Sequence, residues 1–102
     1  MNDSQQRVAA FVDDHDLETP PEFRLLDLVS EIGELAKDAN ESTAYGAEPD
    51  KLDINGDELG DALFALLALA DGVGIDADEA LEEAFEKYER RLEEDGSAGS
   101  GD

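Results

Sequence analysis

The chain has no cysteine and no tryptophan, and only seven Lys and Arg residues stand against 29 Asp and Glu, giving a formal net charge of -22. The absence of cysteine excludes disulfides, thiolate metal sites and thiol catalysis. The shortage of positive charge argues against direct binding to nucleic acid or to an anionic membrane, because both need clustered Lys and Arg. A phosphate-bearing ligand would therefore need metal ions as intermediaries.

Long hydrophobic runs are also missing. The nine apolar residues 62–70 fall far short of the ~20 that span a membrane, and the N-terminus has no signal pattern. We therefore expect a soluble, cytoplasmic protein. The acidic residues are spread along the whole chain, which suits a cytosol at molar salt, where the Debye length is about 3 Å. This predicts a halophilic source; an acidic decoy that mimics nucleic acid is the alternative.

The apolar residues that are present recur at helical spacing, without strand-like alternation, which predicts an all-α fold resembling a four-helix bundle. Helices are expected at about 4–13, 20–40 and 55–73, and again from residue 77, with Thr19 and Asp76 as N-caps of the second and fourth. The third is apolar on most sides, which indicates a bundle centre or a subunit interface. We assign residues 1–93 to a single helical domain and expect the acidic Gly/Ser tail, 94–102, to be disordered.

Two pairs of carboxylates stand out, Glu31 with Glu34 and Glu58 with Asp61. Residues three apart on a helix are neighbours on one face, so two such helices packed side by side would form a four-carboxylate cage. Oxygen ligands without His or Cys select Mg²⁺ or Mn²⁺. The second pair adjoins the apolar run, where an unpaired negative charge is costly, so a cation is expected there.

Each carboxylate also has a purely structural interpretation. The first pair belongs to an acidic flank with Asp27 and Asp38, expected opposite the apolar stripe of its helix and therefore solvated. Glu58 could complete a capping box begun by Asn55. Asp61 distinguishes best between the structural and the metal-binding interpretation, since it lies deeper in its helix and shares a face with the small Ala65 and Ala68.

The two motifs, Glu31-Ile32-Gly33-Glu34 and Glu58-Leu59-Gly60-Asp61, are separated by residues 35–57. With their flanking sequences, from Leu25 to Arg91, they resemble the MazG-like nucleotide pyrophosphohydrolases. The resemblance implies hydrolysis of a nucleoside triphosphate to its monophosphate and pyrophosphate. It also implies that the four motif carboxylates are the catalytic residues and the ligands of Mg²⁺.

The same resemblance implies that basic residues on the last helix, Lys87, Arg90 and Arg91, bind phosphate. Alternatively, they only complement the dipole at the helix C-terminus. Tyr88 stands where the family often has Asn, and there is no tryptophan to stack on a base, so base preference stays undefined.

We therefore expect a Mg²⁺-dependent house-cleaning enzyme that acts on nucleoside triphosphates as a homodimer or homotetramer. One alternative is a phosphoribosyl-ATP pyrophosphatase-like enzyme, against which Phe64-Ala65 replaces the Tyr-His typical of that family. Another is a non-catalytic helical interaction module, against which all four motif acids are intact.

Overall fold

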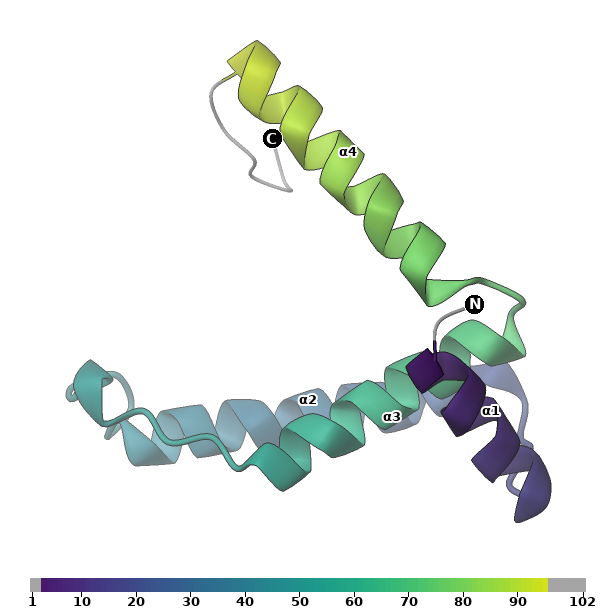
Figure 1. Ribbon diagram of the computed structural model, residues 1–102. Coiled ribbons are helices and arrows are strands. Elements are labelled where there is room, and N and C mark those ends of the chain that lie inside the picture. The colour runs from purple at the N-terminus through teal and green to yellow at the C-terminus, as the bar shows by residue number, and fades with distance from the viewer. Residues whose placement is uncertain (1–2, 96–102) are drawn as a thin grey trace.

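The computed structural model describes residues 3–95, and this part of the chain is helical throughout, without strands (Figure 1). The helices are α1 (Asp3–Asp14), α2 (Pro21–Ser42), α3 (Gly56–Gly72) and α4 (Ala77–Asp95), with a short 3-10 turn, η1 (Pro49–Lys51), before α3. The all-α prediction is confirmed. Helix α4 runs two residues beyond the domain end predicted at residue 93, and residues 96–102 of the predicted tail lie outside the described residues.

The N-caps predicted for α3 and α4 are observed, and the N-cap predicted for α2 is not. Asn55 caps α3 by accepting a hydrogen bond from the backbone N–H of Asp57 at 2.9 Å, and Asp76 caps α4 through Asp78 at 2.9 Å. Thr19 does not cap α2; the N-cap is Pro20, with φ -55° and ψ 141°. Because Pro21 follows it, Pro20 is pushed out of the helical region, and the helix can begin only at the second proline.

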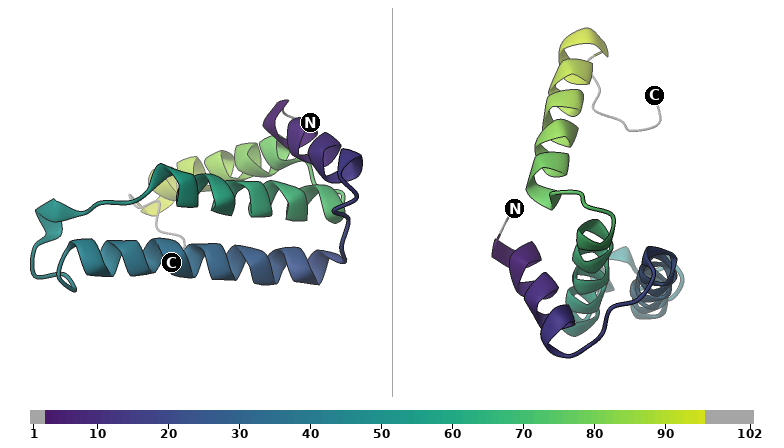
Figure 2. Two further views of the ribbon diagram at one scale, coloured as in Figure 1. Left: turned by 90° about the horizontal axis from the view of Figure 1, so that it is seen from below. Right: turned by 90° about the vertical axis from the view of Figure 1, so that its right-hand side faces the viewer.

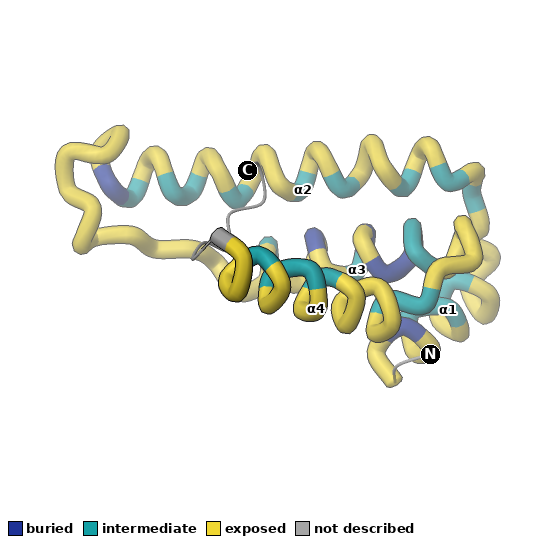
Figure 3. Tube along the Cα trace, turned by 90° about the horizontal axis from the view of Figure 1, so that it is seen from above, coloured by how far each residue is buried: buried dark blue, intermediate teal, exposed yellow. Residues whose placement is uncertain are grey.

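Helices α2 and α3 form an antiparallel pair (Figure 2). The α2 residues that are at least partly covered recur at spacings of three and four, which is the pattern of a helix with one contact face. Seen along the chain trace, these covered positions form one line on the side of α2 that faces α3 (Figure 3). They are Pro21, Arg24, Leu28, Glu31, Leu35, Asp38, Ala39 and Ser42. The contact face of α2 is therefore part apolar and part charged.

The apolar core of the described chain is small and belongs to α3, where Ala62, Ala65, Leu67 and Ala68 are buried. Helix α1 packs on the other side of α3, with the rings of Phe11 and Phe64 meeting edge to face at 5.9 Å. The radius of gyration is 16.6 Å, whereas a compact domain of this length has about 13 Å. The chain by itself is thus more open than a closed bundle.

Helix α4 accounts for this openness. It projects away from the α2–α3 pair, as Figures 1 and 2 show, and packs extensively against none of the other helices. Its apolar side chains Leu81, Phe85 and Leu92 are each about half exposed. The four expected helices are therefore present, but α4 does not close a bundle with the other three.

Candidate functional site

The contact between α2 and α3 carries the acidic residues that the sequence singled out. Glu31 and Asp38 occupy covered positions of α2, and Glu58 lies half-buried in the first turns of α3. The expectation that Glu31 and Asp38 sit on a flank opposite the buried stripe is therefore wrong. Packing instead divides the apolar stripe predicted for this helix, which consists of Leu25, Leu28, Val29, Ile32, Leu35, Ala36 and Ala39. Leu28, Leu35 and Ala39 turn inward, and the other four residues are exposed. We call this contact the acidic groove, formed by Glu31, Glu34, Asp38, Glu58 and Asp61.

Glu58 is the electrostatic centre of the acidic groove. Its pKa is raised from 4.5 to about 7 by a hydrogen bond to the carboxylate of Asp38, then by burial, and then by the negative charges of Asp38, Glu34 and Glu31. All of these influences favour the neutral form of the carboxyl group. Glu58 does not form a capping box with Asn55, whose side chain accepts from the backbone N–H of Asp57 and not from that of Glu58.

Two open cavities lie along the groove. One, of about 680 Å³, is lined by Asp38 and Glu58 together with Glu41 and Asp53. The other, of about 380 Å³, is lined by Glu31 and Asp61 together with Arg24 and Phe64. Both motif helices thus contribute an acid to each cavity. Glu34 and Asp61 are exposed; Asp61 lines the second cavity, and Glu34 lines neither of the two.

The donor set of the groove fits a hard divalent cation. Among residues 3–95, no three carboxylate or imidazole side chains converge as a ready metal-binding group, and mutual repulsion of like charges is a physical reason for such side chains to stand apart. One oxygen of the cluster, Oε2 of Glu58, is nonetheless shielded from solvent and has no hydrogen-bond partner in the described chain. A buried carboxylate oxygen without a partner is costly, and a cation coordinated there would satisfy it.

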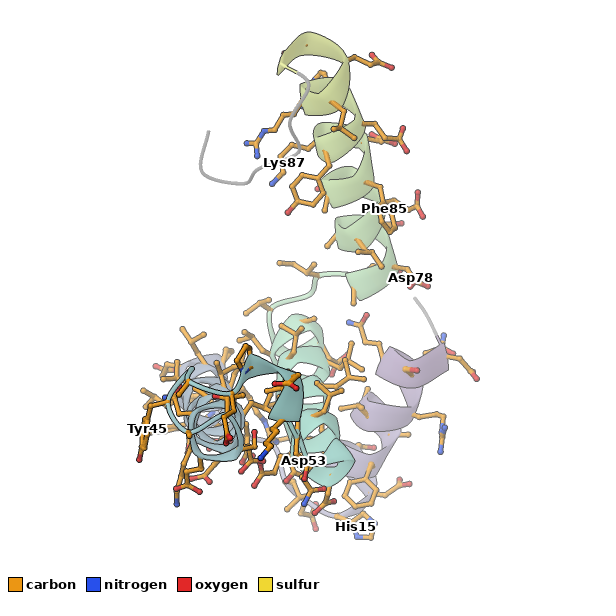
Figure 4. The ribbon with its side chains drawn as sticks, turned by 90° about the vertical axis from the view of Figure 1, so that its left-hand side faces the viewer. His15, Tyr45, Asp53, Asp78, Phe85 and Lys87 are labelled. Carbon is orange, nitrogen blue, oxygen red and sulfur yellow. The ribbon has the colours of Figure 1, made fainter. Side chains whose placement is uncertain are left out.

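The predicted phosphate-binding residues are not brought to the groove of their own chain. Lys87, Arg90 and Arg91 lie in the second half of α4, and Lys87 is held over the ring of Tyr88 at 5.1 Å (Figure 4). The direction of α4 separates this basic segment from the acidic groove. In one chain, the negative and positive parts of the expected site are therefore apart.

Asp38 is the site residue that the sequence interpretation left out of the cluster. It follows Glu31 by seven residues, so both lie on the same side of α2 after two turns. That spacing was visible in the sequence. The importance of Asp38 was not visible, since only the packing shows that this side of α2 faces Glu58 and not solvent.

The comparison with protein families matches residues 20–94 to the MazG nucleotide pyrophosphohydrolase domain. The match contains α2, α3 and nearly all of α4, and with them both carboxylate motifs and the basic segment. The chain belongs to this family, and the predicted resemblance is confirmed. Comparisons with curated proteins and with solved structures gave no match. In residues 3–95, no helix is long and apolar enough to cross a membrane.

Proposed function

We propose that this protein is a Mg²⁺-dependent nucleoside triphosphate pyrophosphohydrolase, which releases pyrophosphate and leaves the nucleoside monophosphate. Mn²⁺ is the alternative cation. The observation that carries the proposal is that Asp38, Glu34 and Glu31 of α2 act together on Glu58 of α3 and raise its pKa to about 7. A cluster of negative charge that is costly without a cation is what a metal-dependent phosphohydrolase needs.

The cation ligands in this proposal are Glu31, Glu34, Glu58 and Asp61, and Asp38 supports Glu58. When bound, the cations supply charge neutralisation for the polyphosphate and activation of a water molecule. A groove carboxylate that is free of cation accepts the proton of that water. The bond from the water oxygen to the α-phosphorus forms while the bond from that phosphorus to the bridging oxygen breaks, and pyrophosphate leaves with the electron pair.

We further propose that the enzyme is a homodimer or homotetramer in which the basic segment of one subunit reaches the acidic groove of another. The buried core of the described chain has four apolar residues, whereas α3 alone exposes Leu59, Leu63 and Leu66 at helical spacing. Exposed apolar surface of this kind marks an association site. The chemistry points the same way, because Lys87, Arg90 and Arg91 would supply the positive charge that a triphosphate needs beside the acids.

The excess acid fits a salt-rich cytoplasm. With a net charge of -22 on 102 residues, self-repulsion opposes both folding and association. At molar salt the screening length falls to about 3 Å and this repulsion is largely removed. We expect the thermal midpoint to rise steeply between 0.1 and 2 M KCl; a midpoint that does not change would contradict the halophilic assignment.

The decisive experiment is a panel of nucleoside triphosphates at molar KCl with Mg²⁺ or Mn²⁺, in which pyrophosphate and orthophosphate are measured separately. Pyrophosphate release that EDTA abolishes supports the proposal. Orthophosphate release would mean cleavage of a different bond. If no triphosphate is hydrolysed while Mg²⁺ still raises the thermal midpoint, the groove binds cations without this activity.

A further inference from the structure

The connection between α3 and α4 is short and held by hydrogen bonds, although α4 itself has no extensive packing contact with the other helices. Only residues 73–76, which we call the elbow, separate the two helices. The C-terminus of α3 is closed by backbone hydrogen bonds from Val73 to Leu69 at 3.1 Å and from Ile75 to Ala70 at 2.9 Å. Gly74 lies between them with φ +73°, the left-handed conformation in which helices commonly end. The direction in which the chain leaves α3 is therefore defined locally.

A residue far away in sequence completes the elbow. Gln5 of α1 is completely buried, and its side chain spans the connection with two short hydrogen bonds. Its Nε2 donates to the carbonyl of Ile75 at 2.7 Å, and its Oε1 accepts from the backbone N–H of Ala77 at 2.7 Å. Ala77 is the first residue of α4. One side chain thus holds both the last part of the elbow and the first N–H of α4.

These contacts matter because packing on the other helices does little to fix the direction of α4. Its apolar side chains are half exposed, and it lacks an extensive contact with α2 or α3. A buried amide that satisfies two backbone groups is costly to remove, since both groups would then lack partners. A helix that is fixed in direction before it meets a partner also loses less freedom on binding.

We infer that Gln5 is a positioning residue that sets the direction of α4 and thereby the place of Lys87, Arg90 and Arg91 in the assembled site. Its role in the reaction rests on the function proposed above. The geometric role of Gln5 does not, because it concerns the angle between α3 and α4 alone. The two parts can therefore be tested by separate measurements on the same variants.

The geometric part is tested with Gln5→Met, which keeps the length of the side chain and removes both hydrogen bonds. Gln6→Met is the matched control, because Gln6 is the exposed neighbour on the same helix. The chain has no cysteine, so spin labels on Glu22→Cys and Glu89→Cys report the α2–α4 distance cleanly, after dilution with unlabelled chain. We expect a broadened or displaced distance distribution in Gln5→Met and an unchanged one in the control. An unchanged distribution in Gln5→Met overturns the inference.

The functional part is tested by steady-state kinetics with Mg²⁺ and the best triphosphate substrate. Misplacing one charged contact to phosphate should raise KM about tenfold, while kcat stays within about twofold. An altered α4 direction with unchanged KM would overturn the positioning role. If the wild-type enzyme hydrolyses no triphosphate, the proposed function fails, while the spin-label result still decides the geometry.

A second variant covers the case in which Gln5→Met does not fold. Gly74→Ala places a side chain in the left-handed conformation, where the strain is in the backbone because no atom lies within 4 Å of the added carbon. This change acts on the elbow without touching α1. Because Gln5 keeps both hydrogen bonds in this variant, we expect an unchanged distance distribution, and a displaced α4 would contradict the inference by showing that the elbow backbone sets the direction of the helix.

Discussion

The acidic groove and α4 differ in what surrounds their side chains. In the groove, packing forces carboxyl groups together until one of them, Glu58, has a pKa of about 7. In α4, the apolar side chains Leu81, Phe85 and Leu92 are about half exposed, and the direction of the helix is fixed from its base by Gln5. A bound cation would lower the electrostatic cost of the groove, and a protein surface would cover the exposed apolar side chains of α4. In the proposed function these are the two halves of one phosphate site, which the proposed assembly would join.

The largest expected effect comes from Glu58→Gln, which breaks the groove and leaves α4 intact. The amide keeps the shape but is a poor cation ligand, so kcat should fall by about 10³-fold, on the scale of losing a metal or acid–base function. Stability without metal should stay the same or rise at pH 8, since a costly negative charge is gone. Kinetics and thermal melts in EDTA measure the two effects, with the exposed Asp57→Asn as control.

Breaking the α4 half should have a smaller effect. Lys87→Gln combined with Arg90→Gln removes two positive charges, and KM should rise ten- to thirtyfold with kcat much less affected. Glu86→Gln with Glu89→Gln is the control for changes at exposed positions of the same helix. If the double variant has the wild-type KM, the basic segment does not bind phosphate and only complements the dipole at the helix C-terminus.

A mixture of these two defective chains tests whether the halves belong to different subunits. Chains carrying Glu58→Gln keep an unaltered α4, and chains carrying Lys87→Gln with Arg90→Gln keep an unaltered acidic groove. In randomly paired dimers, half are mixed, and each mixed dimer has one intact site of two, so about a quarter of the wild-type activity should return when the triphosphate is kept well below KM, where both parent variants are weakly active. No recovery after subunit exchange would show that groove and basic segment act within one chain.

The pH dependence of stability should distinguish the contribution of the groove from that of the other acidic residues. Because the folded protein keeps a proton on Glu58 up to about pH 7, whereas an unfolded chain loses it near 4.5, this contribution is full below about pH 4.5 and is lost as pH rises through 7. Thermal melts in EDTA should therefore show a fall in midpoint from pH 5.5 to 8.5 that is weaker in Glu58→Gln. Equal slopes in the two proteins would contradict the assignment.

Metal binding sharpens the same test. A cation needs the deprotonated carboxylate, so Mg²⁺ should raise the midpoint more at pH 8 than at pH 6. Near pH 7 its binding should release about half a proton from Glu58. Calorimetry in buffers of different ionisation enthalpy measures this proton, and Glu58→Gln should abolish it.

The smallest effect concerns the start of α3, which places Glu58. Asn55→Ala removes the cap and should cost about 1 kcal/mol of unfolding free energy, with a few-fold loss of Mg²⁺ affinity. Thr19→Ala should change neither, because the cap of α2 is Pro20 and makes no side-chain hydrogen bond. Denaturant unfolding and Mg²⁺ titration compare the two variants; an equal loss in both would mean that Thr19 has a role in solution that its geometry does not show.

Local sequence signals were sufficient for much of the fold. Helical periodicity identified all four helices, and short polar side chains before α3 and α4 identified their caps, since both depend on residues a few positions apart. The pair of adjacent prolines misled the assignment of Thr19, because the second proline constrains the first more strongly than a hydroxyl side chain favours its own capping. The carboxylate motifs were equally visible, because three-residue spacing on a helix is a local property.

The sequence by itself determined the family, through its two carboxylate motifs and their flanking residues, and the excess of negative charge. Only the tertiary structure decided which face of α2 turns inward, because Leu25, Val29 and Ile32 compete with the face that carries Glu31 and Asp38, and both have helical spacing. It also decided the raised pKa of Glu58 and the role of Gln5. Both arise from contacts between helices, which no spacing along one helix contains.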